Sequence, residues 1–255
     1  MKAYEKISNA IIAANESGRT ALVPFITAGY PKPKKFTETL KSIASVGDVV
    51  EIGVPFSDPM ADGMTIQRSS FIALQNGVSL KWILDELDSV NDEINTPMIL
   101  MSYLNPLLAF GYEKLAERAL KAGVCGVIVP DLPYEESDEL RKALDKQGLG
   151  LIQLISPATP EERLRKLCDA SRGFVYAVTV TGITGGASMS QDLSDYLNKV
   201  SSFSKTPVCA GFGIRQAKDV KAVGQYVNGA IIGSALVEVL EREENPKTFL
   251  EELLK

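Results

Sequence analysis

Short apolar runs alternate with longer amphipathic segments along the whole chain. The runs have the length of strands and are apolar throughout rather than at every second position, which is typical of parallel strands buried on both faces. Several amphipathic segments end in Gly, a common helix stop, directly before the next run. The pattern therefore predicts eight strands alternating with helices. The predicted strands cover residues 21–27, 48–54, 97–103, 126–130, 150–156, 173–180, 207–211 and 229–233.

Eight β-then-α units in 255 residues match the size of a (β/α)8 TIM barrel. No Pro/Gly/Ser-rich linker divides the chain, so we expect residues 1–255 to form a single domain. Residues 1–17 predict an extra amphipathic N-terminal helix that ends at Gly18. An open doubly wound sheet is the alternative fold, although the turn TAGYPKP after the first strand does not match its Gly-rich fingerprint.

Composition narrows the classes of function. The net charge of -5 argues against nonspecific nucleic-acid binding, and no apolar run is long enough to span a membrane. The N-terminus lacks the apolar core of a signal peptide, and the three cysteines are widely spaced, so we expect reduced thiols in the cytoplasm. The chain contains no histidine. The usual metal sites and nucleophile–histidine pairs are therefore not expected.

Two carboxyl groups lie where the second predicted strand ends, the place where barrel enzymes carry their chemistry. Glu51 lies within the apolar run DVVEIGV, and Asp62 follows in the loop PFSDPMADG. Burial without a partner raises the pKa of a carboxyl group toward neutrality, where it donates and accepts protons. Each residue also has a structural interpretation: Glu51 could form a buried ion pair, and Asp62 before Gly63 could simply form a turn.

Glycine-rich segments follow the last two predicted strands. They are GFGI at 211–214 and GSA at 233–235, and loops at these two places commonly bind phosphate through backbone N–H groups and a helix N-terminus. Ser234 could cap the following helix and offer its hydroxyl. The polar segment TVTGITGGAS at 179–188 predicts either a mobile lid or an idle connection, and Gly185 could add an N–H to the phosphate site.

The motifs together resemble the tryptophan synthase α subunit family. VEIGVPFSDPMADG at 50–63 is similar, position by position, to the signature of that family. Further motifs recur in the family's order and spacing, and they cover nearly the whole chain: VPFITAGYP, NPLLAFG, VPDLPYEE, GITGG, GFGI and GSA.

The resemblance implies a carbon–carbon lyase of tryptophan biosynthesis, which cleaves indole-3-glycerol phosphate to indole and glyceraldehyde 3-phosphate by a retro-aldol reaction. Glu51 would be the acid and base, and Asp62 would hold the indole N–H and stabilise the positive indolenine. The residues implied to hold the phosphate are Gly185, Gly213, Gly233 and Ser234. The positions implied to line the indole pocket are Leu22, Tyr103, Ile128 and Tyr176. Thr184 corresponds to a lid residue that orients the catalytic aspartate.

The resemblance also implies a partner. Family α subunits bind a β subunit that carries pyridoxal phosphate and consumes the indole, in an α2β2 complex, so no cofactor or metal is expected in this chain. The implied contact surface is a rim that holds Pro55, Asp58, Asn105 and Pro133. Two positions depart from many relatives: Met64 replaces a proline, and Val180 replaces a lid arginine.

Three other functions remain open from the sequence. The chain could be a stand-alone lyase that releases free indole. It could also be another phosphate-binding barrel enzyme, of an isomerase or prenyltransferase type, in which Glu51 and Asp62 would be accidental. Finally, it could be a catalytically poor regulatory subunit, which the presence of both Glu51 and Asp62 disfavours.

Overall fold

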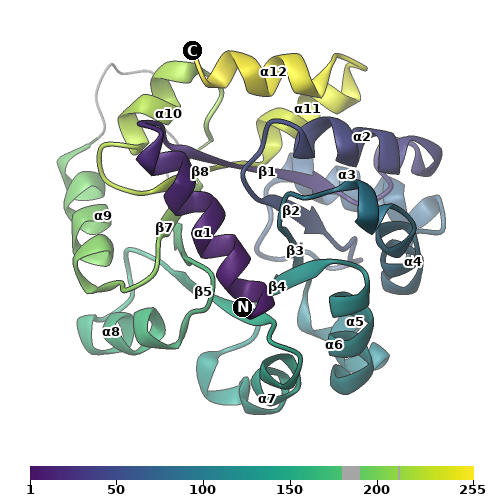
Figure 1. Cartoon of the computed structure of the whole chain (residues 1–255), viewed down its shortest axis with the longest axis horizontal. Helices are drawn as coiled ribbons and strands as arrows, with labels where there is room; N and C mark the ends of the chain where they lie inside the picture. Colours follow the sequence, from purple (N-terminus) through teal and green to yellow (C-terminus); the bar gives the residue numbers. More distant parts are fainter. Residues whose placement is uncertain (180–189, 212) are drawn as a thin grey trace.

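Eight parallel strands close into a barrel in the order in which they occur along the chain, with β1 also pairing with β8. The computed structural model describes residues 1–179, 190–211 and 213–255 (Figure 1). The predicted (β/α)8 barrel is confirmed, and the open doubly wound sheet is wrong. The strands are β1 (Ala21–Thr27), β2 (Val50–Gly53), β3 (Met98–Met101), β4 (Val124–Ile128), β5 (Gly150–Ile155), β6 (Val175–Val178), β7 (Val208–Gly211) and β8 (Gly229–Ile232).

Helices surround the barrel (Figure 1). The α-helices are α1 (Ala3–Glu16), α2 (Phe36–Ala44), α3 (Met64–Gln75), α4 (Leu80–Val90), α5 (Leu104–Phe110), α6 (Tyr112–Lys121), α7 (Asp138–Lys146), α8 (Glu161–Ala170), α9 (Gln191–Phe203), α10 (Ala217–Val223), α11 (Ser234–Glu241) and α12 (Pro246–Leu253). The short 3-10 helices are η1 (Pro33–Lys35), η2 (Asn91–Glu93) and η3 (Tyr134–Glu136). None of the helices in the described ranges has the length and apolar character needed to cross a bilayer.

The apolar core has two layers, because each strand buries both of its faces. Along β1, Ala21 and Val23 belong to the cluster inside the barrel, whereas Leu22 and Ile26 pack in the layer between the barrel and the helices. This double burial explains why the strands are apolar at nearly every position. It also sets the face of each strand residue, since successive side chains alternate between the two layers.

The extra N-terminal helix closes the amino end of the barrel. Figure 1 shows α1 lying across the strands, and its Ile7 and Ile11 are fully buried in the interior cluster. The Ser8 hydroxyl donates a hydrogen bond of 2.6 Å to the carbonyl of Gly173, directly before β6. A Cβ on Gly173 would lie only 3.0 Å from Ile7, so the helix packs directly against this backbone. Only the carboxyl end of the barrel is therefore free to hold a site.

Two local predictions need correction. The fourth strand begins at Val124, two residues before the expected start, because Val124 and Cys125 are buried in the two core layers on either side of the strand. The segment NPLLAFG, interpreted as an apolar loop, lies mostly in α5. Leu107 of this helix is buried in the core, which explains one of its apolar residues, whereas Leu108 is exposed.

Candidate active site

A cavity of about 270 Å³ lies at the carboxyl ends of the strands. Strands β1, β2, β3, β6, β7 and β8, or the loops that follow them, contribute to its wall. It brings together six of the residues that the sequence analysis selected, from segments far apart in the chain. These are Glu51, Asp62, Tyr176, Gly213, Gly233 and Ser234.

Glu51 points into the barrel from β2 and is almost completely buried, with 1% of its surface exposed. Its Oε2 atom has no hydrogen-bond partner in the structure, and no ion pair among the described residues includes it. The ion pair considered as an alternative interpretation is therefore not found there. Burial and, to a smaller extent, the negative charge of Asp62 together raise the pKa of Glu51 to about 8. At neutral pH this carboxyl group is mostly protonated.

Asp62 lies in the loop between β2 and α3 and is held by Tyr103. The Tyr103 hydroxyl donates a hydrogen bond of 3.1 Å to Asp62 Oδ2 and accepts one of 2.8 Å from the backbone N–H of Ala61. The Tyr103 ring in turn stacks on Phe56, with ring centroids 5.1 Å apart. Burial raises the pKa of Asp62, and the hydrogen bond from Tyr103 partly offsets that rise. Tyr103 thus holds the loop that carries Asp62 and is not among the described residues that line the cavity.

The buried Glu51 predicts a pH-dependent cost in stability. The unfolded chain releases this proton above pH 4.5, whereas the folded chain retains it up to a pKa of about 8. Between these values the free energy of unfolding falls as pH rises, by at most ~1.4 kcal/mol per pH unit from this group. We expect Glu51→Gln to unfold like the wild type at pH 4 and to be increasingly more stable from pH 5 to 8. Urea unfolding across this range measures the difference; a constant difference would contradict the raised pKa.

The opposite end of the cavity is formed by backbone. Gly213 has φ of 64°, a left-handed conformation that glycine adopts without strain, and Gly233 has open space where a Cβ would stand. The first backbone N–H groups of α11 have no acceptor within the helix. One prediction is corrected here: Gly233, not Ser234, is the N-cap, and Ser234 is the first helical residue with no side-chain capping bond.

The expectation for Leu22 is wrong. Leu22 lies near the amino end of β1 in the layer that faces the helices, away from the cavity. The residue of β1 that lines the cavity is Phe25, which the sequence analysis missed. Phe25 is the register partner of Glu51 on β2. Counting alternate positions from the predicted strand ends could have found it, since Val23 and Phe25 share the inner face.

The remaining predicted site residues either do not line the cavity or lie outside the described residues. Ile128 is buried in the interior cluster below the cavity, and Met101, its register partner on β3, lines the cavity instead. Met64 is the first residue of α3 and is strongly exposed. Of the predicted lid segment 179–188, Thr179 lines the cavity, and the rest, with Val180, Thr184 and Gly185, lies outside the described residues.

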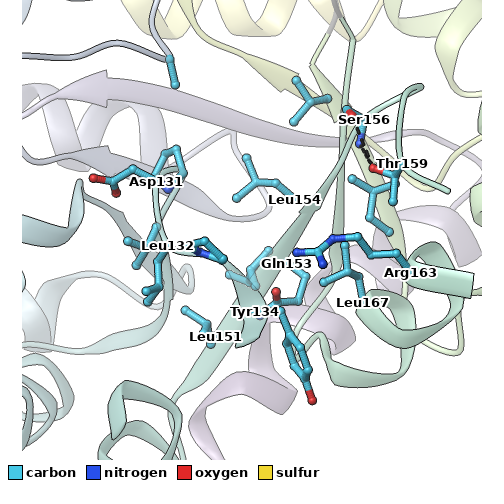
Figure 2. Close-up of a pocket in the computed structure, with 17 residues that line it drawn as sticks. Asp131, Leu132, Tyr134, Leu151, Gln153, Leu154, Ser156, Thr159, Arg163 and Leu167 are labelled. Carbon is cyan, nitrogen blue, oxygen red and sulfur yellow. Dashed lines mark hydrogen bonds between the residues drawn. The ribbon is translucent and has the colours of Figure 1, made fainter. Parts of the chain in front are cut away.

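A second cavity, of about 440 Å³, lies beside the first, between the loop after β4, strand β5 and α8 (Figure 2). Val178 lines both cavities. Figure 2 shows Arg163 reaching from α8 toward Gln153, among mostly apolar side chains. Asp131 supplies the one carboxyl group among the described lining residues, so this larger cavity lacks a pair of acid–base groups. The smaller cavity is the candidate active site.

The predicted partner surface is only partly exposed. Asp58, Asn105 and Pro133 are exposed at the rim, but Pro55 is buried directly after β2, so its assignment to a surface is wrong for the free chain. The exposed Met60 lies two residues after Asp58. Exposed apolar side chains such as Met60 and Pro133 are typical of a surface that contacts another protein.

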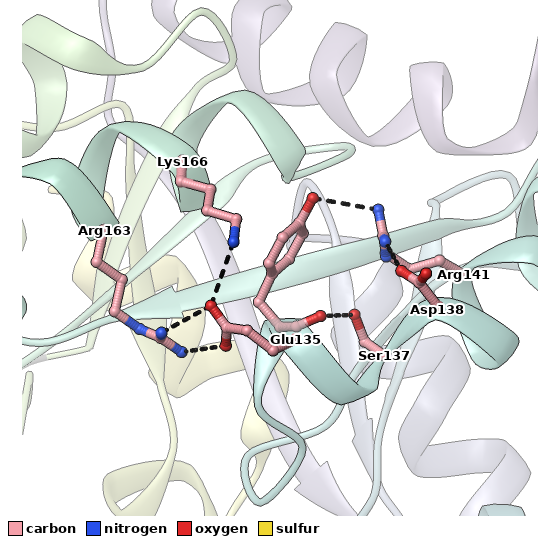
Figure 3. A network of polar contacts seen from close by, with 7 residues as sticks. Glu135, Ser137, Asp138, Arg141, Arg163 and Lys166 are labelled. Carbon is pink, nitrogen blue, oxygen red and sulfur yellow. Dashed lines mark hydrogen bonds and ion pairs between the residues drawn. The ribbon is translucent and has the colours of Figure 1, made fainter.

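The rim loop after β4 is held rigidly by a polar network (Figure 3). Glu135 accepts two hydrogen bonds of 2.9 Å from Arg163 and one of 3.3 Å from Lys166. The ring of Tyr134 lies beneath two cations, Arg141 and Lys166. Pro133 directly precedes these residues, and its backbone is therefore fixed from α7 and α8.

The fold and the cavity together define a class of protein. A parallel (β/α)8 barrel with one buried and one partly buried carboxyl group of raised pKa at the carboxyl ends of its strands has the arrangement typical of a barrel enzyme. Comparison with known proteins gives the family. The family model described as tryptophan synthase alpha chain matches residues 11–255.

Relatives and solved structures agree with that match. Tryptophan synthase alpha chains of Bacillus mycoides (strain KBAB4) and Bacillus cereus (strain AH820) are each 44% identical over 236 residues, covering 92% of this chain and 92% of the relative. The open form of tryptophan synthase from M. tuberculosis with BRD0059 bound superposes with a TM-score of 0.89 at 31% identity, over 98% of this chain and 97% of that one. Tryptophan synthase subunit alpha from Legionella pneumophila str. Paris gives 0.87 at 32% identity, over 100% and 96%.

The chain belongs to the tryptophan synthase alpha chain family. It is therefore a lyase of tryptophan biosynthesis, for which the family implies a β-subunit partner. The stand-alone lyase and the unrelated isomerase or prenyltransferase barrel are not favoured by these matches.

Proposed function

We propose that the chain cleaves indole-3-glycerol phosphate to indole and glyceraldehyde 3-phosphate, with Glu51 as acid and base. The observation that carries the proposal is the buried Glu51 with a pKa of about 8, in one cavity with Asp62. A group that is protonated at neutral pH, yet ionises close to it, suits a reaction that needs both a proton donor and a proton acceptor. No histidine is present to take either role.

The proposed reaction has two proton transfers. The carboxyl group of Glu51 protonates C3 of the indole ring, which makes a positively charged indolenine. The resulting carboxylate then removes the proton of the hydroxyl group on the adjacent glycerol carbon. The bond between that carbon and C3 breaks, its electron pair returns to the indole ring, and the glycerol carbon becomes the aldehyde. Glu51 ends protonated, as it began.

Asp62 supplies the opposite charge in this scheme. Its carboxylate would accept the indole N–H, whose nitrogen becomes positive when C3 is protonated. The hydrogen bond from Tyr103 favours the ionised form of Asp62 and holds its orientation. Tyr176, Phe25 and Met101 would contact the apolar part of the ring, because all three line the cavity. Electrostatic stabilisation of this kind needs a fixed, water-poor site.

The phosphate group is proposed to bind at the Gly213, Gly233 and Ser234 end of the cavity. Loss of backbone access should matter more than loss of a hydroxyl, since the binding groups there are mainly N–H groups. We expect Gly213→Val to weaken glycerol phosphate binding more than Ser234→Ala does, because valine is strained at φ of 64° and obstructs close approach. Calorimetric titration ranks the two variants. The reverse order would place the phosphate elsewhere.

For the partner, we propose an α2β2 complex in which the pyridoxal phosphate belongs to the β subunit and this chain holds no cofactor. The similarity to solved tryptophan synthases and the exposed rim around Asp58, Asn105 and Pro133 support this arrangement. Direct transfer of indole to the β subunit in the cytoplasm would account for a rim contact beside the active site.

The function is tested by incubating the purified chain with indole-3-glycerol phosphate, alone and with a β subunit. We expect equal amounts of indole and glyceraldehyde 3-phosphate, at a rate that the β subunit raises. A high rate alone, unchanged by any β subunit, would favour the stand-alone lyase. Absence of both products under all conditions would disprove the proposed reaction.

A further inference from the structure

The described part of the cavity wall contains acidic side chains but no basic ones, which is unfavourable for an anionic substrate. The described residues that line it include the carboxyl groups of Glu51 and Asp62 and no lysine or arginine. The whole chain carries a net charge of -5. A phosphate bound by backbone N–H groups alone would therefore have no cationic side chain in the described cavity wall to balance its charge. The cation nearest along the chain is Arg215, directly after the lining residue Ile214.

Arg215 forms an ion pair with the carboxylate of Glu238. Its guanidinium donates two hydrogen bonds to Glu238, of 2.6 and 2.9 Å, in the bidentate geometry that makes such pairs strong. Its backbone N–H donates to Asp219 Oδ2 at the start of α10. Glu238 belongs to α11. The ion pair therefore joins the segment after β7 to the helix after β8, the two segments between which the phosphate is proposed to bind.

The position of Glu238 on α11 makes this pair relevant to the ligand. Glu238 is four residues after Ser234, so both lie on one face of the helix, separated by about 6 Å along its axis. The pKa of Glu238 is lowered, first by the hydrogen bond from Arg215, and also by Arg242 and Thr65, so the carboxyl group is ionised at neutral pH. Without a bound cation, its charge would repel a phosphate at the helix N-terminus over a distance shorter than the Debye length.

We infer that Arg215 is a positioning residue of the phosphate site, which neutralises Glu238 and fixes the segment after β7 against α11. This inference rests on the proposed function, since it concerns the same phosphate site. Under this inference, Arg215 and Glu238 affect the affinity for phosphate although neither side chain is among those that line the cavity.

The two partners should then have opposite effects on binding. Arg215→Ala leaves an unpaired carboxylate near the phosphate, so we expect the Kd for glycerol 3-phosphate and the KM for indole-3-glycerol phosphate to rise about tenfold, with kcat changed less than about twofold. Glu238→Gln keeps an acceptor for Arg215 but removes the negative charge, so binding should be unchanged or several-fold tighter. The double variant should recover most of the affinity, because neither charge remains.

The experiment is calorimetric titration of the full-length chain and these three variants with glycerol 3-phosphate at low and high salt, with steady-state kinetics alongside. Arg19→Ala is the matched control, because Arg19 forms a bidentate pair with Asp48 at the amino end of the barrel. It should bind like the wild type, and the defect of Arg215→Ala should shrink at high salt.

Two results would overturn this inference and leave the proposed phosphate site intact. One is wild-type affinity in Arg215→Ala. The other is an equal loss in both single variants with no recovery in the double variant, which would mean that the pair is only a structural tie. If the wild type binds no glycerol 3-phosphate at all, the proposed phosphate site fails and the inference fails with it.

Discussion

Glu51→Gln is expected to lower the turnover of indole-3-glycerol phosphate by about 10²–10⁴-fold while substrate still binds. Glutamine has nearly the same volume and fits the same buried position on β2, but it neither donates the proton to the indole ring nor accepts one from the glycerol hydroxyl. Because Oε2 of Glu51 makes no hydrogen bond to any of the residues that the structure describes, the substitution breaks no hydrogen bond of that atom to them. The loss should therefore fall on kcat, with KM changed little.

The measurement is steady-state formation of indole by wild type and variant, with substrate affinity taken from calorimetry. Glu93→Gln is a suitable control, because Glu93 is an exposed glutamate paired with Lys41. It should retain full activity. Wild-type turnover in Glu51→Gln would remove Glu51 from the mechanism, and loss of binding rather than turnover would make it a substrate-binding residue.

Asp62→Asn is expected to lower turnover by about 10²–10³-fold, comparable to removing one preorganised electrostatic group from an active site. The asparagine keeps an oxygen that accepts the hydrogen bond from Tyr103, so the loop geometry is retained while the negative charge is lost. The charge matters most when the indole nitrogen becomes positive. We therefore expect the effect in kcat to exceed the effect in KM.

The variant Tyr103→Phe distinguishes the effect of the position of Asp62 from the effect of its negative charge. It removes the hydroxyl that holds Asp62 Oδ2 and the N–H of Ala61 but leaves the carboxylate and the stacking on Phe56. A smaller loss of turnover than in Asp62→Asn is expected, measured in the same indole assay. Equal losses would mean that Asp62 acts through its position alone, and no loss in Asp62→Asn would disprove its role.

The barrel could be predicted from the sequence because burial on both faces leaves a strong signal. Residues 21–26 are apolar at every position, and β1 occupies residues 21–27, all of them buried. Residues 50–53 of β2 lie within the predicted run as well, with Glu51 as the one charged member. The same continuous burial hides which face of a strand points inward. Leu22 was placed in the pocket by the family resemblance, and the burial of the whole run gave no sign that Phe25 lines the cavity instead.

The contacts that complete the site could not be predicted, because they join residues far apart in sequence. Nothing near Asp62 in the chain indicates that Tyr103 holds it from the end of β3. The pair of Arg215 and Glu238 likewise connects the segment after β7 to α11, which follows the neighbouring strand β8. Pro55 illustrates a further limit, since a residue in a loop motif was taken as exposed although it is buried.

The most direct test of the proposed chemistry is the titration of the Glu51 side chain in the folded protein. Carbon NMR of chain labelled at the glutamate carboxyl groups, compared with Glu51→Gln, identifies its resonance. The structure predicts one glutamate signal that titrates with a pKa of about 8 and is absent from the variant. If the signal missing from the variant instead titrates near the ordinary glutamate value of about 4.3, Glu51 is ionised at neutral pH and the proposed proton donor is contradicted.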